Sequence, residues 1–155
     1  MSFKPRAVRI PEWNWTVSAR YEQAVVTGPL VRTCGVAPFA ADGDLVGRGD
    51  FDAQMRMVVS NLGRILEASG SSMELIVRQY VYLRRTEDLP VFLRLRDELY
   101  APPYPASVTV VVVAMAHPEM LIEIAVDAVT SEAAGRRAPG DLDDGPERAE
   151  TNRHG

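Results

Sequence analysis

The chain has 155 residues, of which 46% are hydrophobic and 25% are charged, a composition typical of one soluble globular domain. Its formal net charge of −4 argues against a nucleic-acid partner, because binding to phosphates requires a clustered basic face. The single cysteine, Cys34, excludes an intramolecular disulfide and a cysteine-based zinc site. The longest apolar run, residues 110–116, is too short to cross a bilayer, and residues 1–20 contain no apolar stretch of the secretory type. We therefore expect a cytoplasmic protein without a membrane partner.

The two ends of the chain differ in composition from its centre. Residues 1–20 form a mostly polar segment that nevertheless holds Trp13 and Trp15. Burying apolar surface contributes roughly 25 cal/mol per Å², so this N-terminal extension is predicted to pack on the folded domain. Residues 131–155 are nearly free of large apolar side chains and contain two prolines and four glycines, which predicts a disordered tail. The folded domain is expected to span residues 21–130.

The first predicted elements are a β-hairpin and a long helix. Residues 24–27 and 30–36 are rich in β-branched side chains, and Gly28-Pro29 between them is a turn signal. From residue 51 to residue 68 the apolar side chains recur every three or four positions, which is the spacing of an amphipathic helix. Gly70 then supplies a stop signal.

A strand is predicted next, over residues 74–83, where the side chains alternate in character. This alternation would place Val77, Val81 and Leu83 on one face. The opposite face would carry Arg78, Tyr80 and Tyr82.

The last predicted elements are a second helix and two strands. Thr86 or Asp88 can cap the helix, Pro90 is tolerated in its first turn, and Pro102-Pro103 ends it. Residues 108–115 and 120–129 follow as strands. This order predicts an α+β fold, in which two helices cover one face of a mixed sheet. The other face is left in need of a partner, so we expect an oligomer.

Four segments carry a resemblance to a known family when their order and spacing are taken together. They are YEQAVVTGPLVRTCG (21–35), NLGRILEASGSSMELIVRQYVYL (61–83), PYPASVTV (103–110) and LIEIAVDAV (121–129). Over roughly residues 21–129 the sequence resembles the reactive-intermediate deaminase family, also called Rid or YjgF. The resemblance implies a chorismate-mutase-like fold and a homotrimer whose three ligand pockets lie between adjacent subunits.

The resemblance also implies a chemistry, the hydrolysis of imines and enamines with release of ammonia. In that family an arginine clamps the substrate carboxylate by a bidentate pair, and a glutamate positions the attacking water. The glutamate is retained as Glu123, but Ser107 stands where the arginine is expected. A serine cannot replace the planar five-donor fork, so we expect poor turnover of simple 2-imino acids unless Arg78 or Arg32 substitutes.

The remaining pocket positions are also carried over from the resemblance. Cys34 and Leu93 replace more polar residues of the family, so the pocket is expected to take a ligand that is larger, more apolar or without an α-carboxylate. Cys34 could be a nucleophile or a buried structural thiol. The residues expected to hold the ligand are Tyr21, Cys34, Gly35, Leu93, Tyr104, Ser107 and Thr109.

Two functional hypotheses from different classes follow. The first is a divergent Rid-family enzyme that acts on an imine, enamine or related intermediate by hydrolysis, tautomerisation, dehydration or cyclisation, with Glu123 as general acid or base. The second is a non-catalytic small-molecule-binding or regulatory trimer, in which Glu123 makes an intersubunit bond. A ribonuclease activity is disfavoured by the acidic charge. We expect no cofactor and no metal, because His117 and His154 do not have the spacing of metal ligands.

Overall fold

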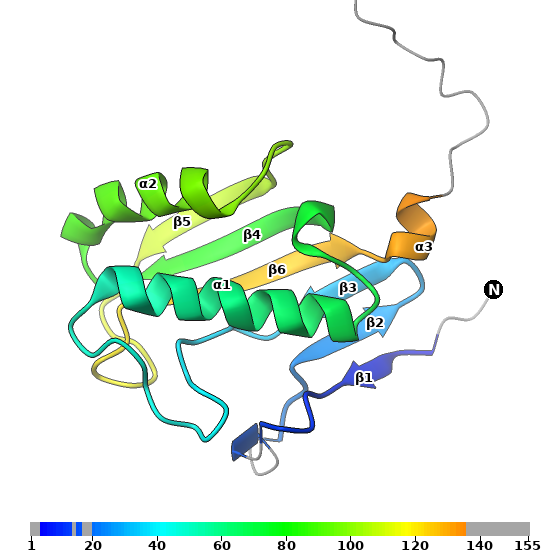
Figure 1. Cartoon of the computed structure of the whole chain (residues 1–155), viewed down its shortest axis with the longest axis horizontal. Helices are drawn as coiled ribbons and strands as arrows, with labels where there is room; N and C mark the ends of the chain where they lie inside the picture. Colours follow the sequence, from blue (N-terminus) through cyan, green and yellow to red (C-terminus); the bar gives the residue numbers. More distant parts are fainter. Residues whose placement is uncertain (1–3, 14, 17–19, 136–155) are drawn as a thin grey trace, which may run out of the picture.

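The structure is a computed structural model that describes residues 4–13, 15–16 and 20–135. Its centre is a six-stranded sheet with the spatial order β1-β2-β3-β6-β4-β5, in which only β4 and β5 run parallel (Figure 1). The strands are β1 (Arg6–Val8), β2 (Ala24–Thr27), β3 (Leu30–Thr33), β4 (Ile76–Leu83), β5 (Ala106–Val111) and β6 (Ile122–Val129). Two helices, α1 (Phe51–Ala68) and α2 (Leu89–Leu99), cover one face of this sheet. The predicted α+β class with a mixed sheet is therefore confirmed.

The predicted hairpin is β2 and β3, joined at Gly28-Pro29 with Thr27 opposite Leu30. The second strand was predicted to continue to Val36, but β3 ends at Thr33. The cause is a side chain, because the Thr33 hydroxyl oxygen accepts the hydrogen bond of the Val126 N–H at 3.0 Å in place of a backbone carbonyl. The chain rejoins β6 only at Val36, which forms an isolated bridge with Ile124.

The first helix has the bounds that its periodicity predicts. The Asp50 carboxylate caps α1 by accepting from the Ala53 N–H at 3.1 Å, and Gly70 takes the left-handed conformation (φ 77°) just beyond its end. Its buried apolar face consists of Phe51, Met55, Val58, Leu62, Ile65 and Leu66. This face packs on the sheet to form the core.

One face assignment in β4 is wrong. Val77 was predicted to lie with Val81 and Leu83, but its side chain is 48% exposed. The pairing of β4 with β6 shifts between Ile76 and Arg78, which is a β-bulge that turns Val77 outward. Ile76 and Gln79 take the buried positions instead, and Gln79 is only 1% exposed.

The capping prediction for the second helix is also corrected. Asp88 is the residue before α2, but its carboxylate accepts from the guanidinium of Arg85 at 2.7 and 2.8 Å and makes no capping bond to the helix. Thr86 begins the short 3-10 turn that precedes α2. The strand predicted over residues 108–115 is β5, which spans Ala106–Val111 and so begins and ends earlier. The strand predicted over residues 120–129 is β6, which begins at Ile122.

Both ends of the chain contribute regular structure. Arg6–Val8 pairs antiparallel with β2 as the edge strand β1, and Trp13 is only 3% exposed. At the other end the predicted tail begins with the one-turn helix α3 (Ser131–Ala134), and residues 136–155 lie outside the described residues. Among the described residues no helix is long and apolar enough to span a membrane.

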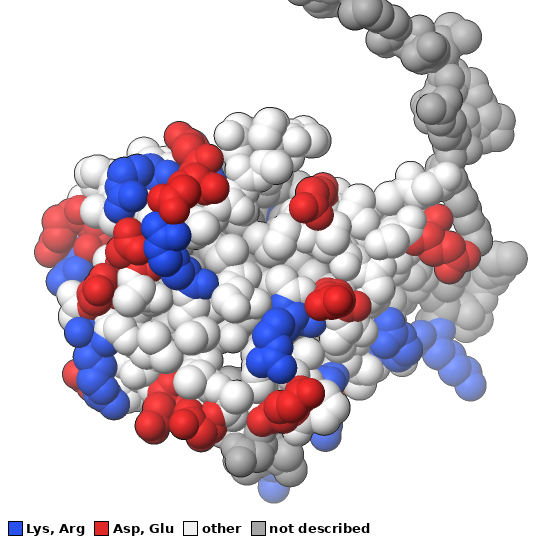
Figure 2. Space-filling view, viewed as in Figure 1, with Lys and Arg blue, Asp and Glu red and all other residues white. Residues whose placement is uncertain are grey.

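The two faces of the sheet differ in character. On the helix-bearing face, basic and acidic side chains are interspersed over α1 and α2 (Figure 2). Asp52 and Arg56 of α1 form ion pairs with Arg94 and Glu98 of α2 at 2.9 to 3.0 Å. The opposite face, which we call the open face, carries neither helix and exposes Val108 and Val110 of β5 to 44% and 40%.

Candidate functional site

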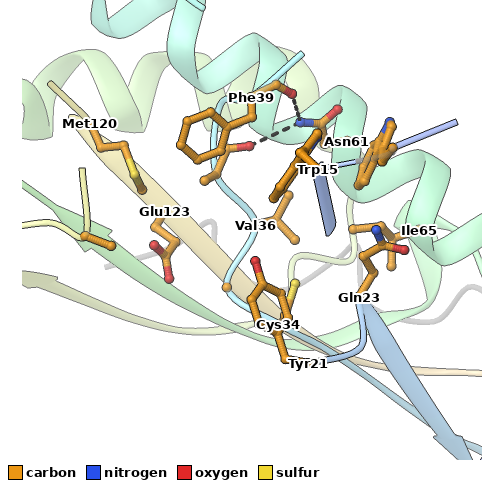
Figure 3. Close-up of a pocket in the computed structure, with 14 residues that line it drawn as sticks. Trp15, Tyr21, Gln23, Cys34, Val36, Phe39, Asn61, Ile65, Met120 and Glu123 are labelled. Carbon is orange, nitrogen blue, oxygen red and sulfur yellow. Dashed lines mark hydrogen bonds between the residues drawn. The ribbon is translucent and has the colours of Figure 1, made fainter. Parts of the chain in front are cut away.

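A cavity of about 320 Å³ lies at the end of the sheet where β3 breaks away from β6 (Figure 3). One wall comes from the N-terminal segment and from residues 35–39, a second from α1, and the floor from the start of β6. Its lining residues are Trp13, Trp15, Tyr21, Gln23, Cys34, Gly35, Val36, Ala37, Phe39, Asn61, Ile65, Ala116, Met120 and Glu123. Apolar and aromatic side chains with a few polar groups are the usual composition of a ligand pocket.

The carboxylate of Glu123 lies directly against the backbone of Gly35. A Cβ atom placed on Gly35 would overlap Oε1 of Glu123 and come within 2.7 Å of its Cδ. Only glycine is therefore compatible with this position of the carboxylate. The contact exists because the chain leaves the sheet after Thr33, whose hydroxyl also donates to the Cys34 carbonyl at 2.8 Å.

The strand that carries Glu123 is fixed at its start by a buried amide. Gln54 of α1 is fully buried, and its Oε1 accepts from the Leu121 N–H at 2.7 Å while its Nε2 donates to the Glu119 carbonyl at 2.9 Å. From there the side chains of β6 alternate as predicted, with Ile122 and Ile124 in the core and Glu123 on the opposite side. Glu123 is thus positioned by Gly35 on one side and by the start of β6, which Gln54 fixes, on the other.

Three weak acids share the cavity, and burial together with the charge of Glu123 raises the pKa of the other two. Burial raises the pKa of Glu123 above its usual value. Burial and the charge of Glu123 raise the pKa of the Cys34 thiol to about 11, and burial followed by the charges of Cys34 and Glu123 raises the pKa of Tyr21. At neutral pH the Cys34 thiol is protonated, which does not support its role as a nucleophile.

The N-terminal wall of the cavity is tied to the core by one buried side chain. Gln23 is 2% exposed, and its Oε1 accepts from the Ile10 N–H at 2.5 Å while its Nε2 donates to the Thr16 hydroxyl at 2.9 Å. The opposite wall is held by Asn61 of α1, whose Nδ2 donates to the carbonyls of Ala37 and Phe39 at 3.1 and 2.9 Å (Figure 3).

Four of the eight predicted site residues meet in this cavity: Tyr21, Cys34, Gly35 and Glu123. The other four lie outside it within a single chain. The Ser107 hydroxyl on β5 accepts from Nε2 of buried Gln79 at 3.0 Å, and Thr109 stands two residues further along the same strand. Leu93 on α2 and Tyr104 are 40% and 51% exposed.

The two arginines considered as replacements for the family arginine do not line the cavity either. Arg32 lies 3.6 Å from the Asp127 carboxylate, in an adjoining pocket of about 520 Å³ that shares Tyr21 and Cys34 with the cavity. The Arg78 guanidinium lies 5.8 Å from the centre of the Tyr80 ring.

Sequence reasoning did not assign the other ten lining residues to the site, among them Trp15, Gln23, Phe39, Asn61 and Met120. The pair Trp13 and Trp15 was noticed in the sequence, but only as a docking signal. Gln23 and Asn61 carry no local signal of their role, because their partners lie in segments that only the fold brings near.

The fold and the cavity together define a small α+β domain of the YjgF type. The Yersinia pestis structure of the conserved Rid family matches 82% of this chain and all of its own with a TM-score of 0.76 at 23% identity. The structure of RidA from an Antarctic Psychrobacter has a TM-score of 0.73 at 27% identity and covers 80% of this chain and 98% of its own. The chain is 30% identical over 121 residues to a 3-aminoacrylate deaminase of Acinetobacter baylyi, which spans 78% of this chain and 95% of the relative. The family model described as endoribonuclease L-PSP matches residues 14–130, and the chain belongs to this family, the Rid or YjgF family.

A first prediction concerns the contact between Gly35 and Glu123. Gly35→Ala should lower the free energy of unfolding by about 1–3 kcal/mol, because the added methyl group forces the buried carboxyl group to move. Chemical denaturation measures this change. Gly63→Ala in α1 is the matched control, since a Cβ there meets nothing within 4 Å. Adding Glu123→Ala to Gly35→Ala should restore most of the loss, and purely additive effects would contradict the contact.

A second prediction follows from the raised pKa of Glu123. The folded state disfavours the charged form of Glu123. The resulting loss of stability is absent below the pKa that Glu123 has in the unfolded chain, and it develops as the pH rises through its pKa in the folded chain. Glu123→Gln should therefore raise the melting temperature relative to wild type more at about pH 7 than at about pH 4. Paired thermal melts at each pH check this, and an equal difference at both would count against a buried, disfavoured carboxylate.

Proposed function

We propose that the chain is a divergent Rid-family enzyme that hydrolyses an imine or enamine, with Glu123 as the general acid and base. The observation that carries this proposal is the position of Glu123, a half-buried carboxylate with a raised pKa in a mostly apolar and aromatic cavity. A group with a pKa closer to neutrality can both accept and return a proton. The similarity to a protein named 3-aminoacrylate deaminase, whose substrate is an enamine, supports the same class of chemistry.

The proposed reaction needs one water molecule and one proton-transfer group. An enamine is first protonated on carbon by the acid form of Glu123 and then loses an N–H proton to the same carboxylate, which gives the imine, while an imine enters directly. Glu123 takes a proton from water as the oxygen attacks the C=N carbon and returns that proton to nitrogen, which gives a carbinolamine. Glu123 then moves the hydroxyl proton of the carbinolamine to the nitrogen, the C–N bond breaks, ammonia leaves and the carbon becomes a carbonyl.

A second candidate function is a non-catalytic small-molecule-binding or regulatory trimer. The replacement of the family arginine by Ser107 favours it, because a bidentate, charge-assisted clamp is lost. Among the described residues that line the cavity none carries a positive charge, so no described lining residue of the chain replaces that clamp. The two candidates differ in turnover and not in the site that they use.

The open face supports the proposal of a homotrimer with intersubunit pockets. Glu123, Tyr82 and Val110 lie side by side across β6, β4 and β5 on this face. Exposed valines on a sheet face that lacks a helix layer favour burial against another copy. We further propose that the β5 edge, whose Ser107 and Thr109 lie on the side of the strand opposite to Val110, lies beside the cavity of the neighbouring subunit together with Leu93 and Tyr104.

A third prediction tests this assembly. Val110→Asp should convert the trimer to monomers, because it buries an unpaired charge at the proposed interface. Light scattering coupled to size-exclusion chromatography measures the mass of the particle. Ser60→Asp, on the exposed side of α1, is the control and should leave the mass unchanged. A wild-type monomer at micromolar concentration would contradict the intersubunit pocket.

A fourth prediction tests the reaction. Wild type should accelerate ammonia release from imines generated by an amine or amino-acid oxidase, and Glu123→Gln should lower kcat/KM by roughly 10²- to 10⁴-fold. Ser107→Arg should improve turnover of 2-iminopropionate by roughly 10- to 100-fold, because it restores a clamp for the carboxylate. If wild type accelerates none of these imines but still binds ligands in the cavity, the non-catalytic candidate is the correct one.

A further inference from the structure

The cavity has a continuous aromatic wall that the proposed mechanism does not use. The Trp13 and Trp15 rings stack with centroids 6.2 Å apart and an interplanar angle of 18°, and the Phe39 ring lies 5.4 Å from that of Trp15. In Figure 3 the Phe39 and Trp15 rings lie together, across the cavity from Glu123 and Tyr21. Offset and tilted rings at such distances form a surface on which a further planar ring can pack.

This wall is held in place before any ligand arrives. Gln23 fixes both ends of the segment that carries the tryptophans through its bonds to Ile10 and Thr16. Gly43 (φ 94°) packs against Trp15. A Cβ atom added to Gly43 would lie 3.0 Å from the Cβ atom of Trp15. A preorganised aromatic wall loses little conformational entropy on binding.

The charge of the cavity is complementary to an iminium and not to a carboxylate. Glu123 is the strongest acid among the described lining residues, and none of those residues is a lysine, arginine or histidine. A ligand carboxylate would therefore meet a like charge in a site of low dielectric constant. A protonated imine would be attracted both to Glu123 and to the faces of the aromatic rings.

The volume that one chain provides also bears on the size of the ligand. At about 320 Å³ it lies at the lower end of the range of ligand pockets, roughly 300–1,000 Å³. This volume suits one or two fused rings. The apolar side chains of Met120 and Ile65 at its edges favour a ligand whose body is apolar.

We propose that the substrates of this site are imines or enamines that carry a planar aromatic group and no carboxylate beside the C=N carbon. This inference rests on the proposed function, since it assigns the substrate class of the same Glu123 site. The aromatic group packs against Trp15 and Phe39, and the nitrogen faces Glu123. Hydrolysis then yields an aromatic aldehyde or ketone and ammonia.

Binding can be measured without turnover, which separates this inference from the proposed function. The chain contains only two tryptophans, Trp13 and Trp15, and both line the cavity, so intrinsic fluorescence reports on its occupation. The probe is 3,4-dihydroisoquinoline, a stable cyclic aryl imine. Its 1-carboxylate and the non-aromatic ring 2,3,4,5-tetrahydropyridine are the matched comparisons. We expect the carboxylate-free aryl imine to bind at least 10-fold more tightly than either, a difference of about 1.4 kcal/mol.

Variants at Trp15 test the wall itself. Trp15→Leu keeps an apolar side chain but removes the ring, and it should weaken binding of the aryl imine by roughly 3- to 10-fold. Trp15→Phe should retain most of the affinity, and Trp13 remains as the fluorescent reporter in both variants. Equal affinity for the carboxylate-bearing and carboxylate-free probes on wild type would overturn the inference, even if a variant fails to fold. Unchanged affinity in folded Trp15→Leu would overturn it as well.

The two proposals can fail separately. If wild type hydrolyses small aliphatic imines through Glu123 but does not bind the aryl imine, the substrate class is wrong and the enzymatic function stands. If the aryl imine binds with the expected selectivity but no imine is turned over, the ligand class stands and the site serves binding alone.

Discussion

The site depends on one steric constraint, the packing of the Glu123 carboxylate against the Cα of Gly35. This contact requires β3 to leave the sheet early, which the Thr33 hydroxyl permits by accepting the Val126 N–H. The break in the strand, the glycine and the carboxylate are thus three parts of one arrangement, and removing any of them should displace the ionisable group of the cavity.

The N-terminal segment serves the fold and the cavity at once. Its first part pairs with β2 as an edge strand, and Trp13 completes the core. Its second part closes the cavity with Trp15, and the buried amide of Gln23 connects the two. Because the same hydrogen bonds hold core and wall, the shape of the cavity is coupled to the stability of the domain.

Ser107 is an uncharged residue on β5 that lies outside the cavity within one chain, and its hydroxyl accepts from the buried amide of Gln79. In the proposed assembly it would bring no cation to the cavity of the neighbouring subunit. With no positive charge among the described lining residues, the remaining recognition is aromatic and apolar, with a single acid. The absence of a cation among these lining residues and the presence of the tryptophan wall therefore point in the same direction, toward ligands without a carboxylate.

The sequence by itself determined the elements whose patterns are local. Side chains a few positions apart determine the period of α1, the turn at Gly28 and the alternation of β6 around Glu123. The family resemblance likewise depends on short segments of the sequence. The tertiary structure alone decided the bulge that exposes Val77, the early end of β3 and the meeting of Trp15 with Phe39. Each of these depends on partners distant in the sequence, such as the bond from Val126 to Thr33, which spans 93 residues. Local periodicity carries no information about such contacts, and for that reason the site could be named in part but not built from the sequence.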